Sequence, residues 1–234
     1  MTGHPISERP VILLAAHGER GGAANNERLA GLVEQVGKAI PDADVGSMLV
    51  NVEGVVERTL EACGARLVLC LPLLFSDGYF FEKRLKPYFS GTGRTLAPPM
   101  ALWRGFAPFL ADNLALRTIS HAADPRVVLV AHGSKQTGRS AACARIVARE
   151  MQARYGQIEV GFLEEAPFAA DVVAAAEPPW VAVGLFLGEG MHGGVDFDVL
   201  VSSAAHSPMA AFTAGELPGL ANLIAAEARS LLAV

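Results

Sequence analysis

One short pattern occurs twice in the chain and restricts the fold more than any other feature of the sequence. Each copy is an apolar run that ends in Ala-His-Gly before a helical pattern, VILLAAHG in the first and VVLVAHG in the second. The two histidines, His17 and His132, are 115 residues apart. Gly78 and Gly190, which follow a later apolar run in each copy, are 112 residues apart. A nearly constant offset over the whole length predicts an internal duplication.

Both copies predict the same alternation of strands and helices. Apolar residues at three- and four-residue spacing mark the helices, and continuous apolar runs are typical of parallel strands that are covered on both faces. The first copy predicts strands at 11–16, 45–50, 66–75 and 95–97, helices at 25–40, 52–62 and 103–122, and a Gly-aromatic loop at 76–89. The second predicts strands at 126–131, 157–162, 180–194 and 209–212, and helices at 140–155, 167–176 and 215–232.

This alternation predicts an α/β protein in which each half is a parallel sheet with helices on both faces. We place the halves at residues 1–123 and 124–234, facing each other across a cleft. Ligands of such sheets bind beyond the carboxyl ends of the strands, so the cleft is expected at that edge.

Composition excludes several classes of protein. The chain is 51% hydrophobic and 18% charged, as a globular protein is, and a net charge of −5 argues against a nucleic-acid partner. It lacks an apolar run long enough to span a membrane and the layout of a signal peptide, so no membrane is expected. Three cysteines without a Cys-x-x-Cys pair fit reduced thiols, and we expect a cytoplasmic protein, with a homodimer left open.

In the second half, His132, Glu164 and His192 each follow a predicted strand, so they should meet at one sheet edge. Two imidazoles and a carboxylate suit a borderline divalent metal, and an imidazole also accepts protons near neutral pH. Glu165 alternates to the other face of its predicted strand and fits less well. The alternative interpretation is that a histidine in Ala-His-Gly only caps the next helix, while the glycine permits the turn.

The first half lacks most of this set. Phe80 stands where His192 stands when Gly78 and Gly190 are superposed, and no carboxylate corresponds to Glu164. Tyr79 and Phe80 offer flat apolar surface on which a planar aromatic ligand could stack, or they are ordinary core residues. Several cations near the two loops either pair with carboxylates of a substrate or are simply solvated: Lys83, Arg84, Lys86, Lys135 and Arg139.

The segments VVLVAHGSK, VGFLEEAPFAADVV and VGLFLGEGMHGGVD together resemble the class II tetrapyrrole chelatases. Within them the chain is most similar to the sirohydrochlorin cobaltochelatases and ferrochelatases of the CbiX/SirB type, in their two-domain form. The resemblance is specific in the second half, where Gly190, His192 and Asp196 stand in order, and only architectural in the first. Two glycines after His192 depart from the family pattern.

The resemblance implies two Rossmann-like, chelatase-like halves with a tetrapyrrole between them. It implies that His132 and His192 handle the metal and the pyrrole protons, with Glu164 as a third metal ligand. It requires no organic cofactor, because the divalent metal (Co²⁺, Fe²⁺ or Ni²⁺) is a substrate. The residues expected to contact the tetrapyrrole are His17, Tyr79, Phe80, Ser134, Lys135 and Gly190.

We therefore expect a lyase-type chelatase that inserts Co²⁺ or Fe²⁺ into sirohydrochlorin in cobalamin or siroheme biosynthesis, a branch of porphyrin biosynthesis. Two alternatives stay open. One is a non-catalytic carrier of a tetrapyrrole or a metal that descends from a chelatase. The other is a ferrochelatase that acts on protoporphyrin, a dicarboxylate.

Overall fold

Two parallel sheets with the same strand order form the centre of the molecule. The computed structural model describes residues 9–17, 27–118, 125–134, 139–188 and 195–232. The first sheet has the order β2-β1-β3-β4, with β1 at Val11–Ala16, β2 at Asp44–Leu49, β3 at Val68–Pro72 and β4 at Arg94–Leu96. The second has the order β6-β5-β7-β8, with β5 at Arg126–Ala131, β6 at Ile158–Phe162, β7 at Trp180–Gly184 and β8 at Ala211–Thr213. The predicted α/β class and duplication are confirmed.

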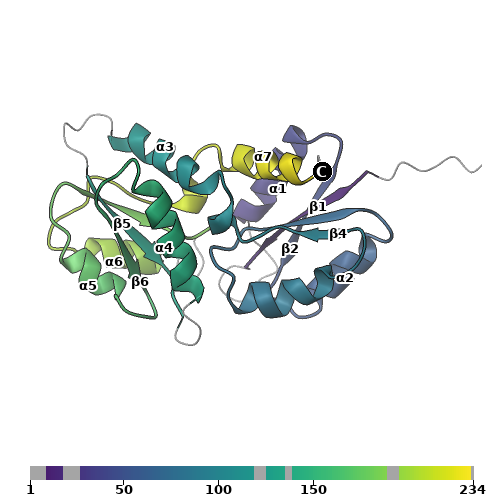
Figure 1. Cartoon of the computed structure of the whole chain (residues 1–234), viewed down its shortest axis with the longest axis horizontal. Helices are drawn as coiled ribbons and strands as arrows, with labels where there is room; N and C mark the ends of the chain where they lie inside the picture. The colour runs from purple at the N-terminus through teal and green to yellow at the C-terminus, as the bar shows by residue number, and fades with distance from the viewer. Residues whose placement is uncertain (1–8, 18–26, 119–124, 135–138, 189–194, 233–234) are drawn as a thin grey trace, which may run out of the picture.

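Helices pack against both sheets and between them (Figure 1). The α-helices are α1 at Glu27–Ala39, α2 at Val55–Ala62, α3 at Phe106–Thr118, α4 at Arg139–Met151, α5 at Ala169–Ala174, α6 at Val195–Ser202 and α7 at Leu220–Leu232. The shorter segments are the π-helix η1 at Phe80–Leu85 and the 3-10 helices η2 at Lys86–Phe89, η3 at Met100–Leu102 and η4 at Ala214–Glu216. No helix in the described segments is long and apolar enough to cross a membrane.

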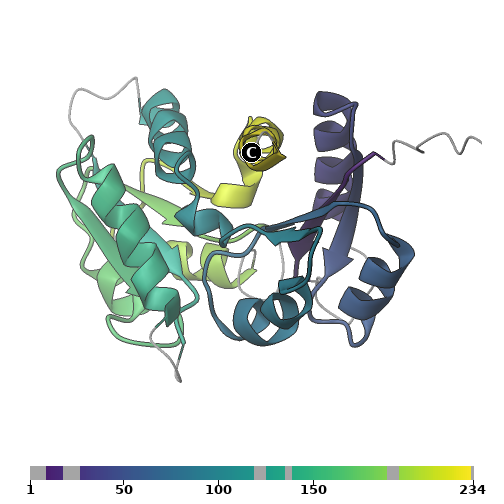
Figure 2. The same ribbon diagram turned by 45° about the vertical axis from the view of Figure 1, so that its right-hand side comes forward.

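The last helix of each half packs against the first helix of the other half. Helix α3 lies beside α4, and α7 lies beside α1 (Figures 1 and 2). The Tyr155 hydroxyl donates to the carbonyl of Ala111 at 3.0 Å, and the Arg229 guanidinium donates to the carbonyl of Ala39 at 2.6 Å. The two sheets therefore share one continuous apolar core, although their strands come from separate halves of the sequence. The boundary between residues 123 and 124 stays a prediction.

Three expectations about the elements were wrong. The loop expected at 76–89 is largely helical, since η1 and η2 occupy residues 80–89. The strand expected at 180–194 ends at Gly184, where β8 and β5 stop pairing with it. Helix α6 was not predicted, because its sequence VDFDVLVS is rich in β-branched and aspartate residues with low helix propensity. Burial of Phe197, which packs on Phe186, favours this helix over its local propensity.

Candidate functional site

His132 and Glu164 come together at the carboxyl edge of the second sheet. His132 directly follows β5, and its carbonyl accepts a hydrogen bond from the backbone of Glu164 at 3.0 Å, which continues the β5–β6 pairing beyond the strands. The His132 Nδ1 atom is 3.8 Å from Oε2 of Glu164, and both side chains are partly open to solvent. The same Nδ1 atom is 3.1 Å from the carbonyl of Gly133.

Glu165 holds the segment that follows His132. Its Oε1 atom accepts a hydrogen bond from the backbone N–H of Ser134 at 2.7 Å. Gly133 has a φ of +76°, and a Cβ atom there would lie 2.9 Å from the Cβ of Phe162 and 3.0 Å from Cγ of Glu165. The segment thus needs a glycine, both for its left-handed backbone and for the close approach of Glu165.

The contact of Glu165 with the His132 segment was not expected from the sequence. The alternation argument placed it on the opposite face of a strand from Glu164, but β6 ends at Phe162. Both glutamates therefore lie beyond the strand, where alternation no longer applies, and both reach the His132 segment. The signal in the sequence is the adjacent Glu-Glu pair, which is costly inside a buried strand and so marks where the strand has ended.

The first half presents His17 at the corresponding place after β1. The His17 ring meets Phe80 edge-on, with ring centroids 4.3 Å apart and an angle of 88° between the rings. Phe80 in turn meets Tyr79 at 5.4 Å, and the Tyr79 side chain is 64% exposed. Tyr79 is thus the exposed ring of this group, whereas Phe80 is partly buried against the apolar core of the first half.

His17 lies near enough to His132 of the other half for the charge of that histidine to act on it. Surrounding protein atoms desolvate the charged form of His17, and the nearby charge of His132 adds to this, so together they lower the pKa of His17 to about 4. His17 is therefore neutral at pH 7. The neutral His17 ring therefore does not repel the metal ion that the sequence predicts at the carboxyl edge of the second sheet.

The lowered pKa predicts an acid-dependent loss of stability. In the unfolded chain a histidine takes up its proton near pH 6.5, whereas folded His17 stays neutral down to about pH 4, so the unfolded state gains protons first as the pH falls. Stability from neutral His17 is present above pH 6.5 and is lost between about pH 6.5 and 4. Because His17 keeps an exposed face, solvent screens part of the effect.

Urea unfolding at pH 7 and pH 4.5 tests this prediction. The wild-type midpoint should fall further between the two values than the midpoint of His17→Gln. The exposed His206 provides a matched control, because His206→Gln should keep the wild-type response. Equal losses in wild type and His17→Gln would contradict the assignment.

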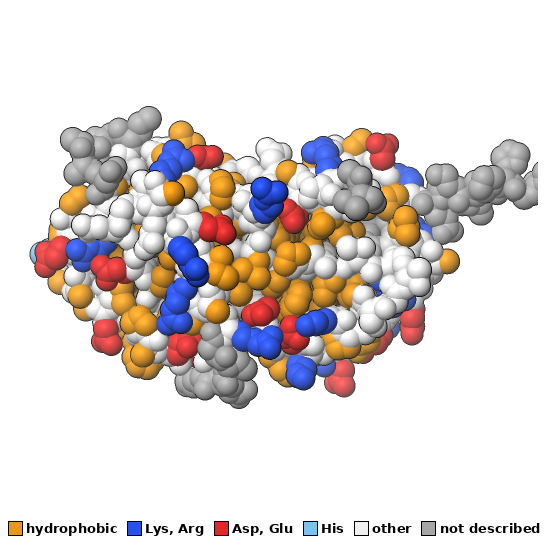
Figure 3. Space-filling view, viewed as in Figure 1, with side chains coloured by type: hydrophobic (Ala, Val, Ile, Leu, Met, Phe, Trp, Pro, Cys, Tyr) orange, Lys and Arg blue, Asp and Glu red, His pale blue; other side chains and the backbone are white. Residues whose placement is uncertain are grey.

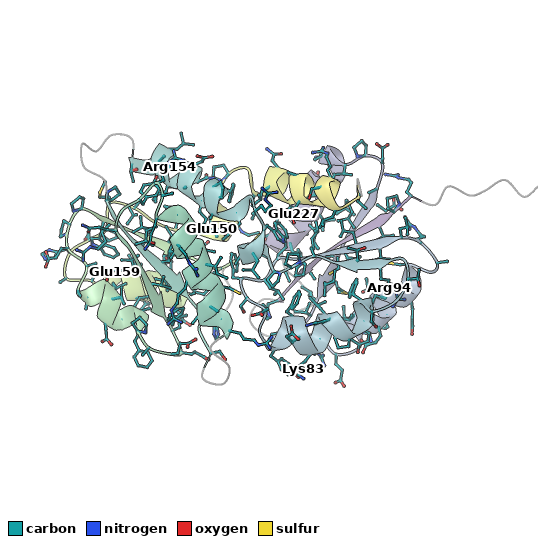
Figure 4. All side chains as sticks on the ribbon, viewed as in Figure 1. Lys83, Arg94, Glu150, Arg154, Glu159 and Glu227 are labelled. Atoms are coloured by element: carbon teal, nitrogen blue, oxygen red, sulfur yellow. The ribbon has the colours of Figure 1, made fainter. Side chains whose placement is uncertain are left out.

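Two of the cations that were expected near the substrate pair with carboxylates of the protein instead. Arg139 lies 3.6 Å from Oδ2 of Asp77 and 3.4 Å from Oε1 of Glu82, and Lys86 donates to Glu82 at 2.9 Å. That hydrogen bond from Lys86, with the charges of Lys86 and Arg139, holds the pKa of Glu82 below its ordinary value. Lys83 is exposed and lies on the outer side of η1 (Figure 4).

Some predicted site residues lie outside the described residues, namely Lys135, Gly190 and His192. Within the part of the chain that the structure describes, no three His, Cys, Asp or Glu side chains gather as a metal site. The described residues bring His132, Glu164 and Ser134 together on one side and His17, Tyr79 and Phe80 on the other. Their functional roles stay predictions.

Each of the duplicated parallel sheets has a histidine just beyond a central strand, so the molecule is a duplicated α/β protein with matching polar edges. Residues 126–229 match the family model described as CbiX. The resemblance to class II chelatases that the motifs indicate is thereby confirmed. No curated protein sequence matches the chain significantly.

Solved structures show the same fold. The CbiX of denitrifying bacteria, described as the terminal enzyme for biosynthesis of siroheme, has a TM-score of 0.79 at 22% identity, over 94% of this chain and 98% of that one. The sirohydrochlorin chelatase SirB from Bacillus subtilis subspecies spizizenii, solved with cobalt, has a TM-score of 0.68 at 17% identity, over 92% and 91%. A multi-domain protein from Deinococcus radiodurans with structural similarity to chelatases has a TM-score of 0.62 at 18% identity, over 93% and 54%.

Proposed function

We propose that this protein is a chelatase that inserts a divalent metal into sirohydrochlorin, with Co²⁺ slightly preferred over Fe²⁺. The observation that carries the proposal is the pair His132–Glu164, 3.8 Å apart, at the strand edge of the segment that matches the CbiX family. The product would serve siroheme or cobalamin biosynthesis. The buried free thiols of Cys63, Cys70 and Cys143 support a reducing compartment such as the cytoplasm.

The proposed chemistry needs two functions from the protein. The incoming M²⁺ ion must exchange water for protein and then pyrrole ligands, and the macrocycle must lose two N–H protons. An imidazole and a carboxylate bind such an ion reversibly, and we assign this role to His132 and Glu164, with His192 as the third ligand. The same imidazoles accept the pyrrole protons, because their ordinary pKa lies near neutrality.

The first half supplies the other wall of the proposed site. Tyr79 and Phe80 offer ring faces and edges to the flat macrocycle, and His17, which contacts Phe80 and lies near His132, is neutral and does not repel the metal ion. We propose that the tetrapyrrole lies between these two sides, and that Ser134, Lys135 and Gly190 also contact it.

One specific observation supports a second candidate, a carrier that binds without turnover. Phe80 stands in the sequence where His192 stands in the second half, and in the structure it packs on His17, so the described residues of the first half gather no set of three metal ligands. A carrier needs only one-sided binding, whereas turnover also needs proton removal and product release.

A spectrophotometric assay separates these functions. Purified protein is mixed with excess metal-free sirohydrochlorin and Co²⁺, Fe²⁺ or Ni²⁺, with protoporphyrin as a comparison substrate, and the absorption change is followed against the uncatalysed rate. A chelatase should form many equivalents of metallated sirohydrochlorin per protein. Binding that stops at one equivalent would favour the carrier, and turnover of protoporphyrin alone would favour a ferrochelatase.

A further inference from the structure

A second polar cluster joins the two halves beside the site. It lies between residues 76–82 of the first half and the start of α4 in the second. The Ser140 hydroxyl donates to the Ser76 hydroxyl at 3.1 Å, and the Cys143 thiol lies 3.8 Å from Oδ1 of Asp77. Arg139, the first residue of α4, pairs with both Asp77 and Glu82. Figure 3 shows basic and acidic side chains gathered at the lower centre, where η1 meets the lower end of α4.

These contacts connect the two segments that carry the walls of the proposed site. Asp77 lies two residues before Tyr79 and three before Phe80, in the connection from β3 to η1. Arg139 begins the helix that follows the His132 segment. The cluster therefore links the segment that leads into the aromatic wall to the helix that follows the His132 segment.

The cluster contributes little to overall stability. The Arg139 side chain is 52% exposed and that of Asp77 is 32% exposed, and ion pairs this open to solvent gain little folding free energy. These ion pairs instead fix the position of η1 relative to α4, because one guanidinium is shared by two carboxylates. The π-helix that starts at Phe80 supports this interpretation, because such irregular turns occur often at functional sites.

We propose that Arg139 and Asp77 form a latch between the halves that positions the Tyr79–Phe80 wall opposite His132 and thereby sets the affinity for the tetrapyrrole. The proposal rests on the proposed chelatase function. Arg139 and Asp77 are positioning residues here, because they act through the wall and not by touching the substrate. The rival role for Arg139 is direct pairing with a substrate carboxylate.

Kinetics of Arg139→Gln test the latch. The aromatic wall would bind the macrocycle equally in the ground state and the transition state, so its misplacement should raise KM about tenfold and leave kcat within about threefold. The melting temperature should stay at the wild-type value. Arg149→Gln is the matched control, since Arg149 is exposed on the same helix and should keep wild-type kinetics. A wild-type KM in Arg139→Gln would overturn the proposal.

Asp77→Asn separates the latch from direct substrate binding. If Asp77 only holds Arg139 in place, Asp77→Asn should raise KM in the same direction as Arg139→Gln, by less because Glu82 still pairs with Arg139, and the double variant should be no worse than Arg139→Gln. If Arg139 instead binds a substrate carboxylate, Asp77→Asn would release it and leave KM unchanged or lower. Multiplicative effects in the double variant would also contradict the latch. Arg139→Lys should restore part of the affinity.

Titration of the metal-free tetrapyrrole distinguishes failure of the latch from failure of the proposed function. The wild-type protein should bind metal-free sirohydrochlorin, and Arg139→Gln should bind it about tenfold more weakly. Wild-type binding and turnover with an unaffected Arg139→Gln would overturn the latch alone. No binding and no turnover in the wild type would overturn the proposed function, and the latch with it.

Discussion

Replacing His132 with alanine should reduce the rate of Co²⁺ insertion into sirohydrochlorin by about 10³-fold, the scale of a lost general base that also binds the metal. The reason is positional as well as chemical. His132 stands at the end of the fully buried part of β5, within 3.8 Å of Glu164, and lies near His17 of the other half. No described residue beside it offers a second imidazole on the same side.

The fold should survive this change, because the His132 side chain is 42% exposed and its replacement leaves no buried cavity. His206→Ala is the control: His206 is exposed, and its contact with Trp180 is made by its backbone carbonyl, which alanine retains. His192→Ala should match His132→Ala, whereas His17→Ala should reduce the rate less. Full activity in a His132→Ala/His192→Ala double variant would refute the mechanism.

Gly133→Ala should reduce the insertion rate by about 10²-fold, because a displacement of about 1 Å at a reacting group has effects of that size. A Cβ atom at Gly133 would meet Phe162 and Glu165 at 2.9–3.0 Å, so Glu165 must retreat. Its hydrogen bond to the Ser134 N–H then breaks, and the segment that carries His132 shifts. Alanine in the left-handed backbone conformation also lowers the free energy of unfolding by about 1–2 kcal/mol.

Gly64→Ala separates strain from displacement. Gly64 has a φ of +62°, similar to Gly133, but a Cβ there would meet nothing within 4 Å. Gly64→Ala should therefore lower the free energy of unfolding, measured with urea, by the same backbone strain as Gly133→Ala. Its metal-insertion activity should stay at the wild-type value. If Gly133→Ala were no more impaired than Gly64→Ala, the close packing of Glu165 on this segment would have no role in the site.

Strand positions were predictable because they depend on local pattern. The runs that became β1 and β5 are continuous and apolar, and each became the buried second strand in the order of its sheet. Strand ends were less predictable, as β7 shows, because a strand stops where its neighbours stop pairing. The helix α6 was missed for a related reason: packing of Phe197 outweighs a poor local propensity.

The candidate site was predictable where it depends on strand ends and not where it depends on side-chain direction. The approach of Glu164 to His132 follows from their places after neighbouring parallel strands. The contact of Glu165 with the Ser134 backbone does not follow from strand positions in the sequence, because it requires β6 to end before both glutamates.

The amino-acid sequence by itself determined that this chain is a duplicated α/β protein, that its strands run parallel, and that His17 and His132 stand at the carboxyl edges of its sheets. These properties depend on hydrophobic periodicity and on the order of elements, which are local. Only the tertiary structure decided that α3 packs against α4 and that α7 packs against α1. It also decided that surrounding atoms keep His17 neutral and that Arg139 pairs with Asp77. Those contacts join residues far apart in the chain, so they depend on how the two halves pack together, which no local pattern specifies.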